Sequence, residues 1–239
     1  SGGSLERHGI ERLLVQHFLD SHASPPTEIV LDLDATDDPV HGEQEGRFFH
    51  GFYGHYCYLP LYVFCGEFLL GATLHTADVA PGKRAVEELE RIVSQIQARW
   101  PDVPIVVRGD SGFCNDEVMS WCEDGGIDYI LGLAQNPRLR AEIRDEMAAA
   151  RAEHERTGED ARVFKDFRYK TRDSWSRERR VVGKAEYITD KENPRFVVTS
   201  FSASAWSARA LYEDLYCARG EMENRIKEQQ HGLFADRTS

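Results

Sequence analysis

The sequence lacks the features that mark several classes of protein. Its five cysteines are odd in number and include no C-x-x-C pair, so neither a disulfide framework nor a zinc site is indicated. No apolar run approaches the roughly 20 residues that span a bilayer, and no signal peptide is present. These absences exclude a disulfide-rich secreted domain and predict a protein of a reducing cytoplasm with no membrane partner.

A net positive charge is also missing. The formal charge is −12, which argues against a protein whose whole surface binds nucleic acid. The charge is unevenly distributed, however, because residues 162–184 hold nine basic and three acidic side chains, a local balance of +6. An acidic chain therefore carries one basic block, which is a candidate surface for DNA.

Length and composition are those of a globular protein. With 239 residues, 41% hydrophobic and 29% charged, the chain can form one large α/β domain or a catalytic core with an inserted subdomain. It begins with Ser-Gly-Gly-Ser rather than Met, which indicates a linker ahead of a fragment. Ile10, Leu13, Leu14, His17 and Phe18 then recur at helical spacing and predict an amphipathic helix.

Alternation of strands and helices predicts an α/β fold. Buried-strand patterns alternate with amphipathic helical patterns, which indicates parallel crossovers beside one antiparallel hairpin. The predicted strands are 28–36, 56–65, 67–76, 104–108 and 128–133, and the predicted helices are 5–22, 81 to about 100, 117–123 and 137 to about 154.

The basic block interrupts this pattern. Strand-like runs at 162–171, 178–188 and 195–201 predict an inserted all-β subdomain, after which a long helix from about Ser204 to His231 resumes the main fold. The predicted organisation is a linker and amphipathic helix (1–26), the first part of the core (27–156), the β insertion (157–203) and the returning core helix (204–239).

Three carboxylates stand at positions that suit metal chemistry. Asp34 ends an apolar strand, Asp110 stands where a second strand gives way to a loop, and Glu223 lies on the last predicted helix. Two Mg²⁺ ions about 4 Å apart can activate both oxygens of a phosphodiester exchange, and hard Mg²⁺ prefers carboxylate oxygen. We predict that Asp34 bridges both ions while Asp110 and Glu223 each bind one.

The helix that carries Glu223 has one notable face. Tyr216, Arg219, Glu223 and Lys227 follow one another at steps of three and four residues and therefore line one side of a helix. This face could contact a substrate phosphate. A solvated helix with ordinary Arg/Glu/Lys pairs stays open as the alternative.

Taken in order, these motifs resemble a known family. LDLDAT with Asp34, VVRGDSGF with Asp110, and Y-x-x-R-x-x-x-E formed by Tyr216, Arg219 and Glu223 resemble the DDE transposases of bacterial insertion sequences, in the branch named YREK. The resemblance covers roughly residues 28–239. It implies an RNase H-like mixed sheet flanked by helices, with the β insertion between the second Asp and the Glu.

The resemblance also implies an activity and partners. Such an enzyme hydrolyses one DNA strand at the element end and joins the free 3′-OH to target DNA, using Mg²⁺ or Mn²⁺. A homodimer assembled on DNA and a location at the bacterial nucleoid are implied as well. Tyr216 and Arg219 are expected to contact DNA phosphate near the cut.

The chain departs from the family pattern in one respect. Gln230 stands where the pattern places a lysine, and Lys227, one helical turn earlier, is the candidate replacement. The resemblance further implies a separate N-terminal DNA-binding domain and sequence beyond Ser239, so we expect an isolated catalytic core.

The basic insertion supplies the other predicted DNA contacts. Trp175, at its turn, could stack on or brace a displaced base, or it could instead close a small β core. The predicted DNA-binding residues are Tyr216, Arg219, Lys227, Arg168, Lys170, Arg172, Trp175, Arg177 and Arg179.

Two other functions compete with a transposase. LDLDAT also satisfies the D-x-D-x-T motif of haloacid dehalogenase-like phosphatases, with Asp32 as nucleophile, Asp34 as acid, and Asp110 followed by Asp116 imitating the metal motif. That family gives no reason for the Tyr216, Arg219 and Glu223 pattern or for the basic insertion. A core that binds DNA without cutting it is the second alternative, and the missing lysine favours it.

Overall fold

The structure, a computed structural model, describes residues 2–35, 38–39, 48–50, 55–75 and 81–218. Its internal contacts divide the chain into two compact units. The first unit comprises residues 1–129 together with 173–176, and the second comprises residues 130–172 and 177–239. Each unit contains both strands and helices.

The sheet of the first unit is built around β1 (Ile29–Ala35). β4 (His55–Cys65) lies antiparallel to one edge of β1, and β6 (Ile105–Gly109) lies parallel to the other. β5 (Phe68–His75) continues the sheet beyond β4, and the short strands β2 (Asp38–Pro39) and β3 (Phe48–His50) also pair with β4. The apolar residues Ile29, Leu31 and Leu33 are fully buried, which explains the nearly unbroken hydrophobic run of β1.

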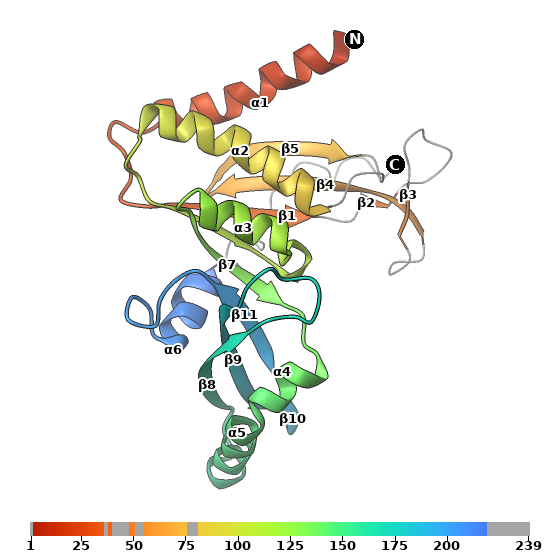
Figure 1. Ribbon diagram of the computed structural model, residues 1–239, viewed down its shortest axis with the longest axis vertical. Coiled ribbons are helices and arrows are strands. Elements are labelled where there is room, and N and C mark those ends of the chain that lie inside the picture. The colour runs from red at the N-terminus through yellow and green to blue at the C-terminus, as the bar shows by residue number, and fades with distance from the viewer. Residues whose placement is uncertain (1, 36–37, 40–47, 51–54, 76–80, 219–239) are drawn as a thin grey trace, which may run out of the picture. The chain divides into compact units, whose positions relative to one another are not determined.

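Three helices accompany this sheet, α1 (Gly2–Asp20), α2 (Pro81–Arg99) and α3 (Asp116–Asp124). Figure 1 shows them lying together beside the strands, with α2 forming the crossover between β5 and β6. The antiparallel β1, β4 and β5 followed by a helical crossover to a parallel β6 form an RNase H-like core. The predicted fold class, a mixed α/β sheet flanked by helices, is confirmed.

The helix predicted near the N-terminus is present as α1, and of the residues whose spacing predicted it Phe18 is buried but Leu13 is not. Leu13 is 67% exposed, whereas Glu11, Val15 and Leu19 are buried with Phe18. The Glu11 carboxylate lies 3.8 Å from Arg91 Nε of α2, and the Glu11 backbone carbonyl accepts a 3.0 Å hydrogen bond from the same guanidinium. The ring of Phe18 meets those of Phe68 and Trp100 edge to face, at centroid distances of 5.4 and 6.0 Å.

The second unit has an antiparallel sheet in the order β7, β11, β9, β8. These strands are β7 (Asp128–Leu133, which pairs through residues 130–133), β11 (Arg195–Thr199), β9 (Arg179–Ile188) and β8 (Ala161–Tyr169), with the two-residue β10 (Lys191–Glu192) on β9. The three strands expected in the insertion are therefore present. The domain boundary at 157–203 stays a prediction.

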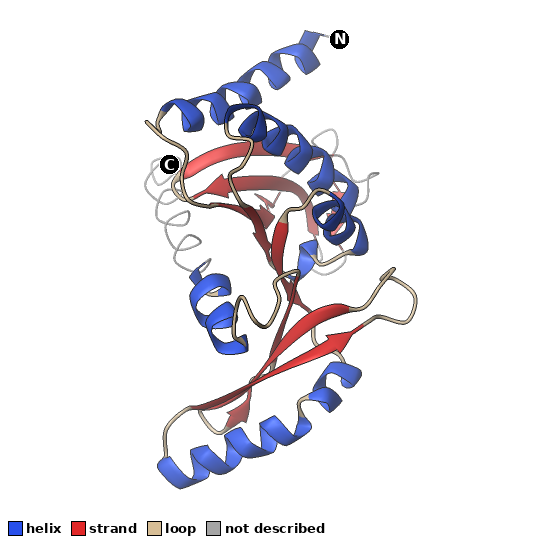
Figure 2. Cartoon of the chain, turned by 60° about the vertical axis from the view of Figure 1, so that its left-hand side comes forward, coloured by secondary structure: helices blue, strands red, loops and turns tan. Residues whose placement is uncertain are grey.

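The single helix predicted from residue 137 is two helices, α4 (Pro137–Glu142) and α5 (Arg144–Thr157). The break falls at Ile143, which has φ −107° and ψ 22° and is fully buried. Its side chain packs so closely on β9 that a Cβ added to Gly183 would lie 2.6 Å from its Cγ2. Figure 2 shows α5 running along the strand pair that includes β9.

The last helix begins later than predicted. Ser207 caps α6 (Ala208–Ala210) by accepting a 3.3 Å hydrogen bond from the Ala210 N–H, and the chain continues as a π-helical segment, η2 (Leu211–Tyr216). Leu211, Tyr212 and Leu215 of η2 pack on a cluster that includes Val182 of β9. The rest of the helix predicted to reach His231 lies outside the described residues.

His154, near the end of α5, is expected to make stability depend on pH. Its Nδ1 lies 2.6 Å from the Glu159 carbonyl and its Nε2 lies 3.2 Å from Asp190 Oδ1. These groups raise the pKa of His154, and the hydrogen bond to Glu159 is the largest cause. A raised pKa adds stability that is complete below about pH 6.5 and is lost as the pH rises through the folded-state value.

The check is thermal unfolding of the wild type and His154→Gln across a pH series. We expect the wild type to have the higher midpoint at acidic pH and the difference to shrink as the pH rises above about 6.5 and through the folded-state pKa. A difference that is constant with pH would contradict the role of the charged ring.

Within the part of the chain that the structure describes, no helix has both the length and the apolar composition needed to cross a membrane.

Candidate active site

The structure brings two of the three predicted carboxylates together. β1 and β6 are parallel, and Leu33 pairs with Gly109, so Asp34 and Asp110 occupy the next positions in the same register. Both are partly buried. Because adjacent parallel strands end at the same edge of a sheet, both residues lie at that edge.

The loop after β6 holds the Asp110 carboxylate in place. Asp110 is the N-terminal cap of the short 3₁₀ helix η1 (Ser111–Phe113), and its Oδ1 accepts a 2.8 Å hydrogen bond from the Gly112 N–H. A Cβ added to Gly112 would lie 3.0 Å from that same oxygen. The glycine in the Gly109-Asp110-Ser111-Gly112 loop therefore gives the carboxylate room beside the backbone.

Gly112→Ala is expected to displace the Asp110 carboxylate without unfolding the loop. A contact at 3.0 Å forces a shift of a few tenths of an ångström, and a misplacement of about 1 Å costs roughly 10²-fold in rate. We expect single-turnover DNA cleavage to slow by roughly 10-fold. Ser111→Ala, which adds no bulk at the neighbouring exposed position, is the control, and equal rates for both variants would contradict the crowding argument.

Asp32, two residues before Asp34, is bound to Arg108 of β6. The guanidinium donates through Nε to Oδ1 at 2.5 Å and through Nη2 to Oδ2 at 2.8 Å. Asp32 is 1% exposed and Arg108 is 7% exposed. Both carboxylate oxygens are thus hydrogen-bonded and closed to solvent.

This ion pair argues against the phosphatase hypothesis. A nucleophilic Asp32 would have to reach substrate, but it is buried against Arg108. Asp116, the metal residue of that hypothesis, accepts hydrogen bonds on Oδ1 from the N–H and the hydroxyl of Ser176, at 2.9 and 3.1 Å. We do not retain the phosphatase alternative.

Cys65 is no nucleophile either. Burial, and next the negative charge of Asp32, raise the pKa of the Cys65 thiol to about 12, against a hydrogen bond with the Val30 backbone. The thiol is therefore neutral near pH 7.

Of the predicted helix face, the structure describes Tyr216. It ends η2, is partly buried, and its ring centroid lies 5.5 Å from that of Tyr212. Arg219, Glu223, Lys227 and Gln230 lie outside the described residues. The alignment of these residues on one face stays a prediction.

The chemistry of the donors fits a hard divalent cation in part. Two carboxylates at adjoining strand ends supply the oxygen ligands that Mg²⁺ prefers. In the ranges that the structure describes, no group of three or more His, Cys, Asp or Glu side chains is placed to hold a metal ion. Asp34 and Asp110 alone therefore do not complete a metal site among the described residues, and the metal site with Glu223 stays a prediction.

The basic block of the insertion is largely paired inside the second unit. Arg180 binds Asp166 at 2.6 Å, and both Arg162 and Lys184 bind the buried Glu186 at 2.6 Å. The positively charged surface is therefore smaller than the sequence suggests. Among the members of the predicted DNA-binding set that the structure describes, the exposed ones are Arg168, Lys170, Arg172 and Arg177.

Two other members of that set are buried. Arg179 is 2% exposed and Trp175 is 4% exposed. Neither side chain therefore presents a surface to DNA in this structure. Arg179 is the first residue of β9, and Trp175 belongs to residues 173–176, which are part of the first unit. We leave both out of the DNA-contacting set proposed below.

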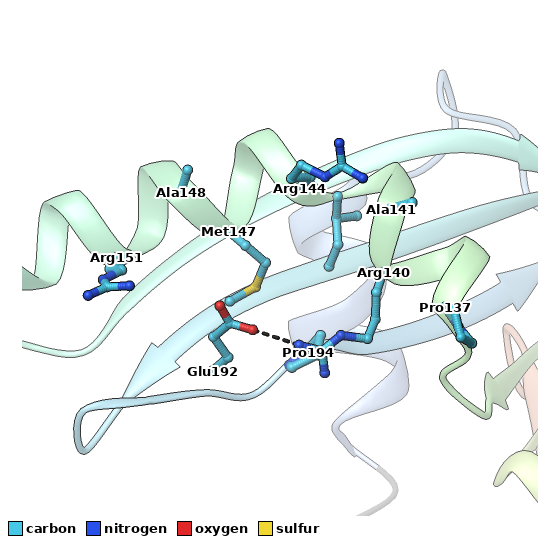
Figure 3. Close-up of a pocket in the computed structure, with 10 residues that line it drawn as sticks. Pro137, Arg140, Ala141, Arg144, Met147, Ala148, Arg151, Glu192 and Pro194 are labelled. Carbon is cyan, nitrogen blue, oxygen red and sulfur yellow. Dashed lines mark hydrogen bonds and ion pairs between the residues drawn. The ribbon is translucent and has the colours of Figure 1, made fainter.

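A groove of about 630 Å³ lies between α4, α5 and the β10 region (Figure 3). Arg140, Arg144 and Arg151 line it together with apolar side chains such as Met147, and Arg140 binds Glu192 at 2.7 Å. This groove was not predicted from the sequence, although the spacing of the three arginines was a signal. With one carboxylate in its lining, it offers no second site for metal chemistry.

The fold is an α/β core that presents two acidic residues, Asp34 and Asp110, where neighbouring parallel strands end. A family model described as transposase DDE domain group 1 matches residues 3–239. The chain belongs to this family of transposase catalytic domains, which are nucleases that act on DNA. The expected relationship to DDE transposases is confirmed, whereas the YREK branch stays a prediction.

Other comparisons add little. No curated protein matches the chain. A solved structure of an endonuclease V from Ciona intestinalis, in complex with a 23mer DNA containing an inosine followed by a ribo-adenosine, is similar at 13% identity and a TM-score of 0.36. The match covers 81% of this chain and 82% of that chain.

Proposed function

We propose that this chain is the catalytic domain of an insertion-sequence transposase that cleaves one DNA strand at the element end and joins the free 3′-OH to target DNA. The observation that carries the proposal is the register of β1 and β6, which sets Asp34 beside Asp110. Family membership over residues 3–239 supports the same conclusion.

In this proposal Asp34, Asp110 and Glu223 hold two Mg²⁺ ions, for which Mn²⁺ can substitute. When bound, the ions supply positive charge to the attacking and leaving oxygens of the phosphodiester. Asp34 and Asp110 present their carboxylates from strand ends, and the hydrogen bond from Gly112 fixes the orientation of Asp110. Rigid placement of this kind lowers the reorganisation that the reaction requires.

DNA would be bound by charge and by the last helix. Arg168, Lys170, Arg172 and Arg177 are exposed cations of the insertion and are proposed to contact backbone phosphates, so binding should weaken with salt. Tyr216, Arg219 and Lys227 are proposed to contact phosphate near the cut. We further propose a homodimer on DNA, since two element ends must be joined, and action at the bacterial nucleoid.

The test is strand cleavage by the complete gene product. The substrate is a duplex that carries the terminal repeat found beside the gene, incubated with Mg²⁺, with Mn²⁺, or with a chelator. Nicking at the repeat end that requires the metal, followed by joining of the 3′-OH to a second duplex, would support the proposal. If the protein binds the duplex but never cuts it with either metal, the proposal is wrong. The chain is then a core that binds DNA without cutting it, the alternative that the missing lysine at Gln230 supports.

A further inference from the structure

The buried pair Asp32–Arg108 lies directly behind the two carboxylates of the candidate active site. Asp32 is the register partner of Arg108. Asp34 and Asp110 are each two residues further along the chain and continue the same register. Side chains two residues apart on a strand share a face of the sheet. The ion pair and the carboxylate pair therefore occupy successive positions on one face of the same two strands.

The geometry of the pair is restrictive. A guanidinium that donates through Nε and Nη2 to both oxygens of one carboxylate fixes the distance and the relative orientation of the two groups. Because Asp32 and Arg108 belong to different strands, this contact also fixes β1 against β6 one residue before the last pair of their register, Leu33 and Gly109. Hydrophobic residues at the two positions would bury as well but would impose no such geometry.

The contact also neutralises a carboxylate beside the proposed metal site. An unpaired Asp32 would add a further negative charge on the face that carries Asp34 and Asp110. With Arg108 bound to both of its oxygens, Asp32 is not an available oxygen ligand. Because Arg108 occupies Asp32, the metal ligands that remain on this face of the two strands are Asp34 and Asp110.

We propose that Asp32 and Arg108 are positioning residues of the transposase active site, which set the spacing of Asp34 and Asp110 for binding divalent cations. The inference rests on the proposed function, since it assigns the pair a role in metal binding. It predicts that the pair matters for cation affinity beyond its contribution to folding. A purely structural pair has no such effect.

The experiment separates these roles by replacing both partners. Removing one partner leaves a buried unpaired charge, whereas replacing a buried ion pair by apolar residues of similar volume is often neutral for stability. The key variant is therefore Asp32→Leu with Arg108→Met. Arg108→Lys, which keeps the charge but loses the two-pronged contact, tests geometry against charge, and Arg140→Met with Glu192→Leu is the control at an exposed pair.

Each complete protein is assayed for folding by hydrogen exchange of the β1 and β6 amides, and for Mn²⁺ binding by titration calorimetry. We expect the double variant at Asp32 and Arg108 to keep its amide protection but to bind Mn²⁺ roughly 10- to 100-fold more weakly, as is typical when residues that orient metal ligands are lost. Arg108→Lys should also bind more weakly, and the control pair should bind as the wild type does.

The outcomes distinguish the two proposals. If the wild type binds Mn²⁺ and the folded double variant binds it equally well, the positioning role is wrong and the proposed function stands. A double variant that loses the protection of β1 and β6 shows that the pair is needed for folding, and this too contradicts the proposal. If the wild type neither binds Mn²⁺ nor cleaves DNA, the proposed function fails and this inference fails with it.

Discussion

Replacing Asp34 or Asp110 with asparagine is expected to slow metal-dependent strand cleavage by roughly 10³-fold, the upper end of the range for loss of one preorganised electrostatic contact. Asparagine keeps the size and one acceptor oxygen of aspartate but loses the negative charge that a divalent cation requires. Each site lies at a strand end and is only partly buried. The substitutions should therefore leave folding intact.

The measurement is the single-turnover cleavage rate of the terminal-repeat duplex, with DNA affinity measured in parallel. Asp102→Asn, at an exposed aspartate between α2 and β6, is the matched control and should cleave as the wild type does. DNA affinity should change little in all three variants, because the exposed cations of the insertion are unaltered. Cleavage that survives either Asp34→Asn or Asp110→Asn would show that the pair at the strand ends is not catalytic.

Glu186→Leu is expected to destabilise the second unit by about 3 kcal/mol, the lower end of the range for breaking a buried ion pair. Glu186 is 3% exposed and accepts hydrogen bonds of 2.6 Å from Arg162, Lys184 and Asn193. Leucine would leave Lys184, itself buried, without its carboxylate. The half-exposed Arg162 can turn to water, which limits the loss.

Hydrogen exchange of the β8, β9 and β11 amides measures this loss within the second unit alone. Glu192→Leu is the control, because the pair of Glu192 with Arg140 is exposed on both sides and should contribute less than about 1 kcal/mol. Equal protection in the two variants would contradict the prediction.

The same carboxylate should make the second unit sensitive to acid. Burial raises the pKa of Glu186, but hydrogen bonds and charge from Lys184, followed by Arg162 and Asn193, outweigh it and lower the pKa. A lowered carboxyl pKa gives stability that is complete above the unfolded value of about 4.3 and is lost as the pH falls through the folded value. The difference between wild type and Glu186→Leu should therefore shrink below about pH 4.

Local patterns in the sequence predicted much of the first unit. The run from Ile29 to Leu33 is buried on both faces, and such a run identifies a central strand by composition alone. Asp110 was found because Gly109 and Gly112 mark the end of a strand. Tyr216 was named from helical spacing, and the structure places it at the end of a π-helical segment that spacing could not predict.

The misassigned residues share a physical cause. Arg179 and Trp175 look like ligands for DNA in a basic, turn-rich stretch, yet both are buried. Leu13 looks like a core residue of α1, yet it is exposed, whereas Val15, Phe18 and Leu19 of the same helix are buried. Burial of a side chain depends on partners far away in the chain, which local periodicity does not contain.

By itself the sequence determined the order of strands and helices, the positions of Asp34 and Asp110 at strand ends, and the membership of the chain in a transposase family. These follow from local hydrophobic periodicity, turn residues and motif order. Only the tertiary structure decided that β1 and β6 are parallel neighbours in a register that joins Asp32 to Arg108 and sets Asp34 beside Asp110. Strand pairing is a contact between residues more than 70 positions apart, and its register is fixed by packing of the whole sheet.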